Sequence, residues 1–84
     1  MYQAVYSEDA LRQILALRPA SKRDFLLRRI EQLAENPFTR GDFEVTDQTG
    51  RKNQVLVLSG IAITFRADHP VNEVRIVSVT TLPR

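Results

Sequence analysis

The hydrophobic pattern of this 84-residue chain changes its period at Asn36-Pro37. From Ala10 to Ala34, apolar residues recur every three or four positions, which is typical of helices packed on one side. From Phe43 onward, apolar and polar residues alternate, which is typical of strands in a half-buried sheet. A chain of this length buries only a small core, and without cysteine it has no disulfide to reinforce it. We therefore expect one α+β domain, residues 1–84.

Proline residues and capping side chains set the limits of two predicted helices. Ser7 is a candidate N-cap followed by two acidic residues, and Pro19 forbids a helix beyond about residue 17. Ser21 is a plausible second cap for a longer helix over residues 22–35, which Asn36-Pro37 ends. The short connection between the two segments predicts a helix hairpin.

The other segments predict a small, largely antiparallel sheet of four or five strands. Ser59-Gly60 separates two β-rich runs and is a typical two-residue hairpin turn. Such a hairpin places Leu58 opposite Ile61 and gives one apolar face that should meet the helices. Residues 68–72 form a turn before the last strand. The predicted order is β-α-α-β-β-β-β, with strands over residues 2–6, 43–47, 54–58, 61–66 and 74–81.

Positive charge is concentrated at the start of the second predicted helix. The formal net charge of the chain is only +2, but residues 18–29 hold five basic side chains and one acidic one. Four of them are candidate RNA or phosphate contacts on the outward face of this helix, a solvated helix face being the alternative: Lys22, Arg23, Arg28 and Arg29. The rest of the chain carries seven basic and nine acidic residues, whereas a dedicated DNA-binding domain is usually more strongly basic.

Several function classes are disfavoured by composition. Without cysteine the chain can form no thiolate zinc site, iron–sulfur cluster or cysteine nucleophile, and its acids show no metal-ligand spacing. We expect no metal and no cofactor. No apolar run approaches the roughly 18 residues of a membrane span, and acids stand where a signal peptide has lysines. We expect a cytoplasmic protein without a membrane partner, beginning at Met1 or Tyr2.

Five segments, taken in order, resemble the RelE/ParE superfamily of bacterial toxin–antitoxin toxins. The resemblance covers nearly the whole chain and implies a sheet backed by a helix hairpin. It also implies a cognate antitoxin as partner, and a toxin that either cleaves mRNA on the ribosome or poisons DNA gyrase. The segments are Tyr6-Ser7-Glu8-Asp9-Ala10, Leu33-Ala34-Glu35-Asn36-Pro37, Gln54-Val55-Leu56-Val57-Leu58-Ser59-Gly60, Ile63-Thr64-Phe65-Arg66-Ala67-Asp68 and Val74-Arg75-Ile76-Val77-Ser78-Val79.

The chain departs from the pattern of the ribosome-dependent nucleases on its first long central strand. Those nucleases carry lysines there, whereas this sequence has Val55 and Val57. The resemblance therefore places the chain in a divergent, short branch with depleted nuclease positions.

Metal-independent RNA cleavage needs a proton acceptor for the 2′-hydroxyl, cations for the developing charge and a proton donor. Histidine is the residue type that titrates near neutral pH, and His69 is the only one present. Arg66 and Arg75 flank the same turn and could clamp a phosphate, with Arg51 and Lys52 as further contacts. The alternatives are a polar turn residue at His69, ion pairs of the arginines with Asp68 and Glu73, and turn solubility for Arg51-Lys52.

Three functions follow from these observations. The first is the toxin of a type II toxin–antitoxin system that inhibits translation as an mRNA endoribonuclease. The second is a non-enzymatic toxin that poisons DNA gyrase, which the two valines favour. The third is a non-catalytic scaffold that binds an antitoxin-like partner.

Overall fold

The predicted element order, β-α-α-β-β-β-β, is confirmed in the computed structural model, which describes residues 1–83. A short 3₁₀ turn, His69–Val71, joins the last two strands. The elements are β1 (Gln3–Tyr6), α1 (Glu8–Leu15), α2 (Ala20–Glu35), β2 (Phe43–Thr46), β3 (Lys52–Leu58), β4 (Ile61–Asp68) and β5 (Glu73–Thr81).

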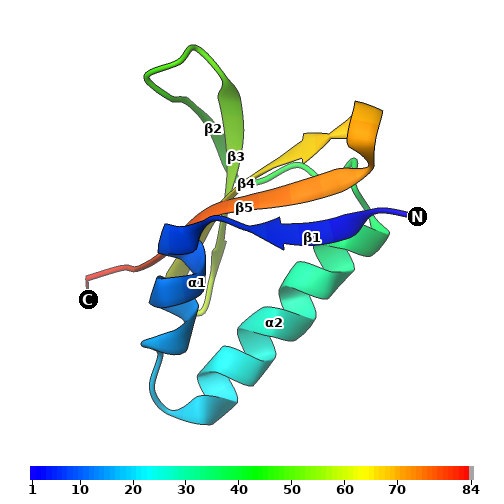
Figure 1. Cartoon of the computed structure of the whole chain (residues 1–84). Coiled ribbons are helices and arrows are strands. Elements are labelled where there is room, and N and C mark those ends of the chain that lie inside the picture. The colour runs from blue at the N-terminus through cyan, green and yellow to red at the C-terminus, as the bar shows by residue number, and fades with distance from the viewer. Residues whose placement is uncertain (84) are drawn as a thin grey trace.

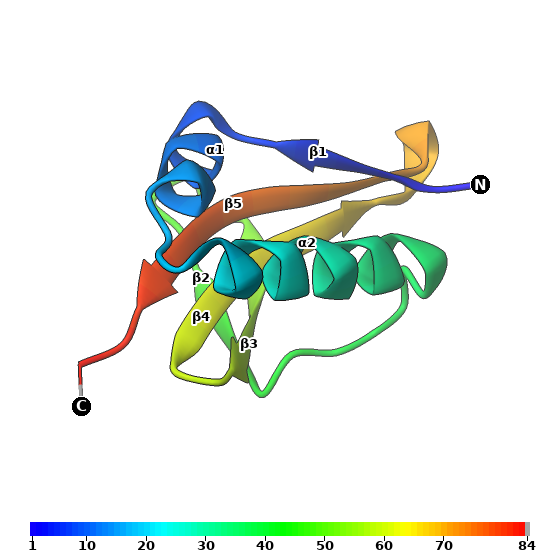
Figure 2. The same cartoon turned by 90° about the horizontal axis from the view of Figure 1, so that it is seen from below.

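The five strands form one mixed sheet in the order β1-β5-β4-β3-β2. β1 pairs with β5 in parallel, and the other three pairings are antiparallel. Both helices lie on one side of the sheet, and the turn of the β2–β3 hairpin extends away from them (Figure 1). Seen from below, α2 crosses the sheet (Figure 2). In the described part of the chain, no α-helix covers the opposite face of the sheet.

Alternation along β4 builds the core. Ile61, Ile63 and Phe65 are buried against the helices, and every second residue points to the open face. The predicted hairpin register is confirmed, because Leu58 pairs with Ile61 and Leu56 with Ile63. The turn residues Ser59 and Gly60 both have positive φ, 49° and 78°, which is the backbone conformation that this tight hairpin requires. The other buried core residues are Ala10, Ile14, Leu17, Leu26, Ile30, Leu33, Val74, Ile76 and Val79.

The predicted cap of the second helix is wrong. α2 begins at Ala20 and its N-cap residue is Pro19, which makes no side-chain capping hydrogen bond. The ring of Pro19 holds φ at −73°, and with ψ at 173° the backbone is extended, as at an N-cap. Ser21 therefore lies inside the first helical turn, where its hydroxyl cannot cap the helix.

The predicted outward face of the basic cluster is correct only for Arg28, which is exposed. Lys22, Arg23 and Arg29 are half-buried. The reason is the helical angle of about 100° per residue, which places these three beside the buried line of Leu26 rather than opposite it. Their aliphatic stems cover the margins of the core.

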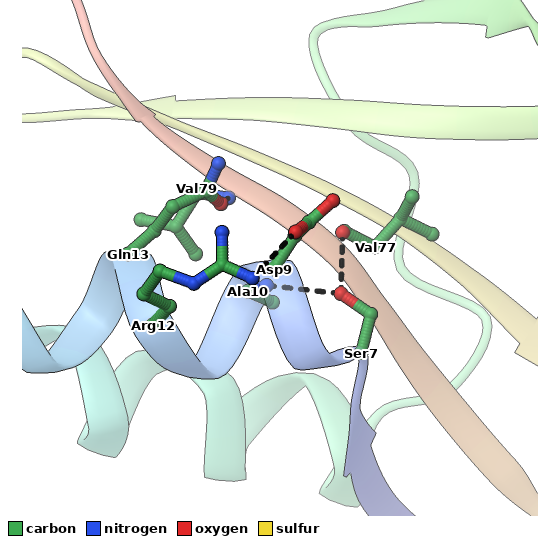
Figure 3. A network of polar contacts seen from close by, with 7 residues as sticks. All are labelled: Ser7, Asp9, Ala10, Arg12, Gln13, Val77 and Val79. Atoms are coloured by element: carbon green, nitrogen blue, oxygen red, sulfur yellow. Dashed lines mark hydrogen bonds and ion pairs between the residues drawn. The ribbon is translucent and has the colours of Figure 1, made fainter.

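Beyond the end of β1, side chains in and next to α1 form hydrogen bonds to the backbone of β5. The last β1–β5 pair is Tyr6 with Ile76, and Val77 has no partner in β4 because the register shifts there. Ser7 Oγ donates to the Val77 carbonyl at 2.7 Å and accepts from the Ala10 amide at 2.9 Å, so one hydroxyl caps α1 and binds β5 (Figure 3). Gln13 Oε1 accepts from the Val79 amide at 2.7 Å. The side chains of the N-cap and of α1 thus satisfy backbone groups of β5 that a neighbouring strand would otherwise pair with.

We expect Ser7→Ala to lower the free energy of unfolding by about 1–2 kcal/mol, because it removes an N-cap and leaves the Val77 carbonyl without its partner. The matched control is Ser21→Ala, which should change stability by less than about 0.5 kcal/mol. Urea unfolding of both variants measures the difference. An equal loss in the two variants would contradict this account of where the helices are capped.

Candidate functional site

Two arginines lie side by side on the open face of the sheet. Arg66 in β4 and Arg75 in β5 are directly paired in the antiparallel ladder. Each follows the alternation of its strand: Arg66 comes after buried Phe65, and Arg75 comes between buried Val74 and Ile76. Both side chains therefore point away from the helices. The sequence-based expectation that the two strands bring these arginines together is confirmed.

Among the described residues, only one of these two arginines forms ion pairs with carboxylates. Arg75 Nη2 lies 3.0 Å from Glu73 Oε1, and Arg75 Nε lies 3.4 Å from Asp68 Oδ2. Like charges directly opposite each other on a sheet repel, so the two carboxylates offset the repulsion between the arginines. Within residues 1–83, Arg66 has no ion pair. The ion-pair interpretation thus holds for Arg75, and Arg66 keeps its guanidinium available to an anion.

His69 begins the turn between β4 and β5 and belongs to a small aromatic cluster. Its Nδ1 and the Tyr2 hydroxyl are 2.6 Å apart and share a hydrogen bond. Its ring stacks on Phe38, with centroids 4.8 Å apart and planes at 16°. Asn72 closes the turn in the left-handed conformation, φ 53°, which asparagine tolerates. The imidazole is exposed but held on two sides, so it is more than a solvated turn residue.

Two clefts meet at this turn. The larger, of about 560 Å³, is lined by Arg51, Arg66, Ala67, Asp68, His69, Pro70 and Arg75. The smaller, of about 310 Å³, also contains Arg66 and His69 and extends to Phe38, Arg40 and Lys52. The structure therefore brings together five of the nine basic residues that the sequence suggested. Lys22, Arg23, Arg28 and Arg29 belong to α2, on the helix-covered side of the sheet, and line neither cleft.

Arg51 is positioned by the β2–β3 turn. Asp47 Oδ1 accepts hydrogen bonds from the Thr49 hydroxyl at 2.6 Å, the Thr49 amide at 2.9 Å and the Arg51 amide at 3.0 Å. The bond from the Thr49 hydroxyl is the main reason that the pKa of Asp47 lies below its ordinary value, and the two amides act in the same direction. Arg51 thus lies at the end of a fixed turn, directly before β3.

This arrangement can bind a phosphate and move a proton beside it. The guanidinium of Arg66 is a planar, permanently charged donor that suits a phosphate. When Nδ1 of the neutral His69 ring donates to the Tyr2 oxygen, Nε2 carries no proton and can accept one. Sequence analysis missed Phe38 and the contact between Tyr2 and His69. Alternation marked Tyr2 as an ordinary strand residue, and no local signal connects positions 2, 38 and 69.

Two further observations concern the described part of the chain. Among residues 1–83, no group of three or more histidine, aspartate or glutamate side chains is placed to hold a metal ion. No helix in the same range is long and apolar enough to cross a membrane.

Comparisons with known proteins identify the fold. No protein-family model matches the sequence, and no curated protein is similar to it in sequence. Among solved structures, a chain of the toxin–antitoxin complex RelBE2 from Mycobacterium tuberculosis matches with a TM-score of 0.78 and 16% identity, over 95% of this chain and 96% of that one. The isolated Escherichia coli RelE toxin matches with a TM-score of 0.72 and 16% identity, over 100% of this chain and 87% of its own.

A chain of the intact Escherichia coli RelBE toxin–antitoxin complex also matches, with a TM-score of 0.67, 16% identity and full coverage of both chains. Identities this low are informative about fold alone. The chain therefore has a RelE-like fold, and the resemblance predicted from the residue pattern is confirmed at that level.

We expect nuclear magnetic resonance titration to find the Asp47 carboxyl ionising below its ordinary pKa of 3.8. Because the folded-state value is lowered, the ionised carboxylate stabilises the turn above the ordinary value, and this contribution is lost as pH falls through the lowered value. Thr49→Val should move the pKa upward, because it removes the largest cause. Thr46→Val, on the neighbouring strand, is the control and should leave it unchanged. Titration of Asp47 at or above 3.8 would contradict the assignment.

Proposed function

We propose that this chain is the toxin of a type II toxin–antitoxin system and that residues 1–84 act as one toxin domain. An antitoxin protein is its proposed partner. Its proposed activity is to inhibit translation in the cytoplasm by cleaving mRNA on the ribosome. The observation that carries this proposal is the position of His69, which lines one cleft with unpaired Arg66 in a chain that has a RelE-like fold over its whole length.

The proposed reaction uses this chain's own side chains. Arg66, aided by Arg51, binds the scissile phosphate and stabilises the negative charge that develops when the neighbouring 2′-hydroxyl attacks it. His69 takes the proton of that hydroxyl through Nε2, while its Nδ1–H donates to the Tyr2 oxygen and so holds the imidazole. The bond between phosphorus and the 5′-oxygen then breaks, which leaves a 2′,3′-cyclic phosphate, and water protonates the departing 5′-oxygen. Arg75 orders the site through its carboxylate partners. Catalysis of this kind depends on position and electrostatics and on no metal.

Poisoning of DNA gyrase is the second candidate. Two observations favour a toxin that binds without catalysis. Val55 is buried and Val57 is partly exposed on β3, where the ribosome-dependent nucleases that the sequence resembles carry lysines. In addition, the charge of Arg75 is balanced by Asp68 and Glu73, which reduces the positive charge available to a transition state.

Controlled induction in a bacterial host separates these candidates. We expect growth arrest with new mRNA ends and no DNA-damage response. Arrest with a damage response and intact mRNA would instead support gyrase poisoning. Undisturbed growth at a confirmed expression level would contradict both toxin proposals and leave the scaffold interpretation.

We expect Arg66→Ala and His69→Ala each to reduce mRNA cleavage by about 100-fold or more, because the first removes the charge-stabilising donor and the second the proton acceptor. Arg12→Ala is the matched control. Arg12 is an exposed arginine on α1 whose only ion pair within residues 1–83 is with Asp9, 3.2 Å away, so its loss should leave cleavage unchanged. Primer extension on a reporter mRNA measures the rates. Cleavage at the wild-type rate in either site variant would remove that residue from the mechanism.

A further inference from the structure

Phe38 combines high exposure with a fixed position. Its side chain is 78% exposed, although large apolar side chains usually avoid water. One face of the ring is covered by the His69 imidazole at a centroid distance of 4.8 Å, and the high exposure leaves the other face to solvent. His69 is in turn held by Tyr2, through the 2.6 Å hydrogen bond and an edge contact with centroids 5.6 Å apart.

The backbone around Phe38 is also held. The amide and the hydroxyl of Thr39 both donate to the Asn36 carbonyl, at 3.0 and 2.7 Å. A few residues later, the Gly41 amide donates to Gln54 Oε1 at 2.8 Å, and a Cβ on Gly41 would come within 2.4 Å of the Val55 carbonyl oxygen. The loop therefore lies tightly against β3, and the ring of Phe38 is presented in one place before any ligand arrives.

The surroundings of the exposed ring are cationic rather than apolar. The cleft of about 310 Å³ beside Phe38 is lined by Arg40 and Arg66, which have no ion pair within residues 1–83, and by Lys52 with its partner Glu44, 3.9 Å away. Its basic side chains thus outnumber its single carboxylate. Among the residues that the structure describes, no other exposed large apolar side chain lines this cleft. An aromatic face bordered by cations is typical of sites for unpaired nucleobases, whereas protein contacts generally use several apolar side chains together.

We propose that Phe38 is a stacking platform for one base of a single-stranded RNA, and that Arg40 and Lys52 attract the backbone of the same strand. This inference rests on the proposed function and adds a binding subsite to it. The 310 Å³ cleft beside Phe38 and the 560 Å³ cleft both contain Arg66 and His69. A strand whose phosphate occupies the 560 Å³ cleft therefore passes over the His69 turn. The neighbouring base then stacks on the open face of Phe38. Stacking accepts any base and gives affinity without sequence readout.

The absence of tryptophan from the chain allows a direct test. Phe38→Trp introduces a single tryptophan with a larger stacking face, and excitation above the absorption of the two tyrosines isolates its emission. The probe is a short single-stranded 2′-O-methyl oligoadenylate, which cannot be cleaved because its 2′-oxygens are blocked. We expect the oligonucleotide to quench the emission of the variant. Phe43→Trp is the matched control, since Phe43 is also exposed, at 53%, but lies on β2 and lines neither cleft.

Affinity separates stacking from simple apolar contact. Phe38→Leu keeps an apolar side chain against His69 but has no aromatic face, and we expect it to weaken binding of the oligoadenylate to the otherwise wild-type chain about 5- to 150-fold. Phe43→Leu should bind as the wild type does. Thermal unfolding of each variant accompanies the titration, and an unchanged melting temperature in Phe38→Leu assigns its loss of affinity to the site.

Several results would overturn the platform. These are equal quenching in the two tryptophan variants, wild-type affinity in Phe38→Leu, no binding of the oligoadenylate by the wild-type chain, and binding of adenosine monophosphate as tightly as the oligonucleotide. The last result would indicate a site for free nucleotides. Failure of the proposed function has a different signature: induction of the wild-type chain leaves mRNA intact. New mRNA ends in the wild type, with unchanged cleavage and binding in Phe38→Leu, would reject the platform alone.

Discussion

Burial of one face of the β4–β5 pair against the two helices is the constraint on which the other features depend. Ile61, Ile63 and Phe65 on β4 face the helices, so the alternation of the strand directs the Arg66 side chain to the open face of the sheet. The same alternation on β5 sends Arg75 to the open face, and the ladder register places it opposite Arg66. A shift of one residue in either strand would bury an arginine, so the energy of the core also fixes the geometry of the candidate site.

The local electrostatics follow from that geometry. Two guanidinium groups paired across a ladder repel each other, and the nearby strand ends supply Asp68 and Glu73, which both contact Arg75. Because both carboxylates are engaged by one arginine, the other keeps its full charge for a ligand. Arg75 is therefore a structural ion pair, and this asymmetry is the reason that we propose Arg66 as the anion contact.

Three distant segments converge at the end of the sheet. Tyr2 precedes β1, Phe38 follows α2, and His69 begins the turn between β4 and β5. Parallel pairing of β1 with β5 brings the N-terminal segment to this turn, and the length of α2 returns the chain to the same end (Figure 1). The three rings hold one another, so the imidazole has a defined position although it is exposed. This fixed imidazole, between the two clefts, is the feature on which the proposed handling of RNA rests.

The sequence by itself determined the element order, the hairpin at Ser59-Gly60 with its register, and the face of β4 that enters the core. These features depend on residues close together in the chain, where period and turn chemistry act directly. It also gave Arg66, His69 and Arg75 as neighbours, because they flank one short turn. It misplaced the cap at Ser21 and the face of Lys22, Arg23 and Arg29, since cap position and helix rotation are settled by packing. Only the tertiary structure decided which arginine is paired, because Asp68 and Glu73 lie near both arginines in the sequence and side-chain geometry makes the choice. It also decided which rings surround His69, because those contacts join residues dozens of positions apart and leave no local pattern.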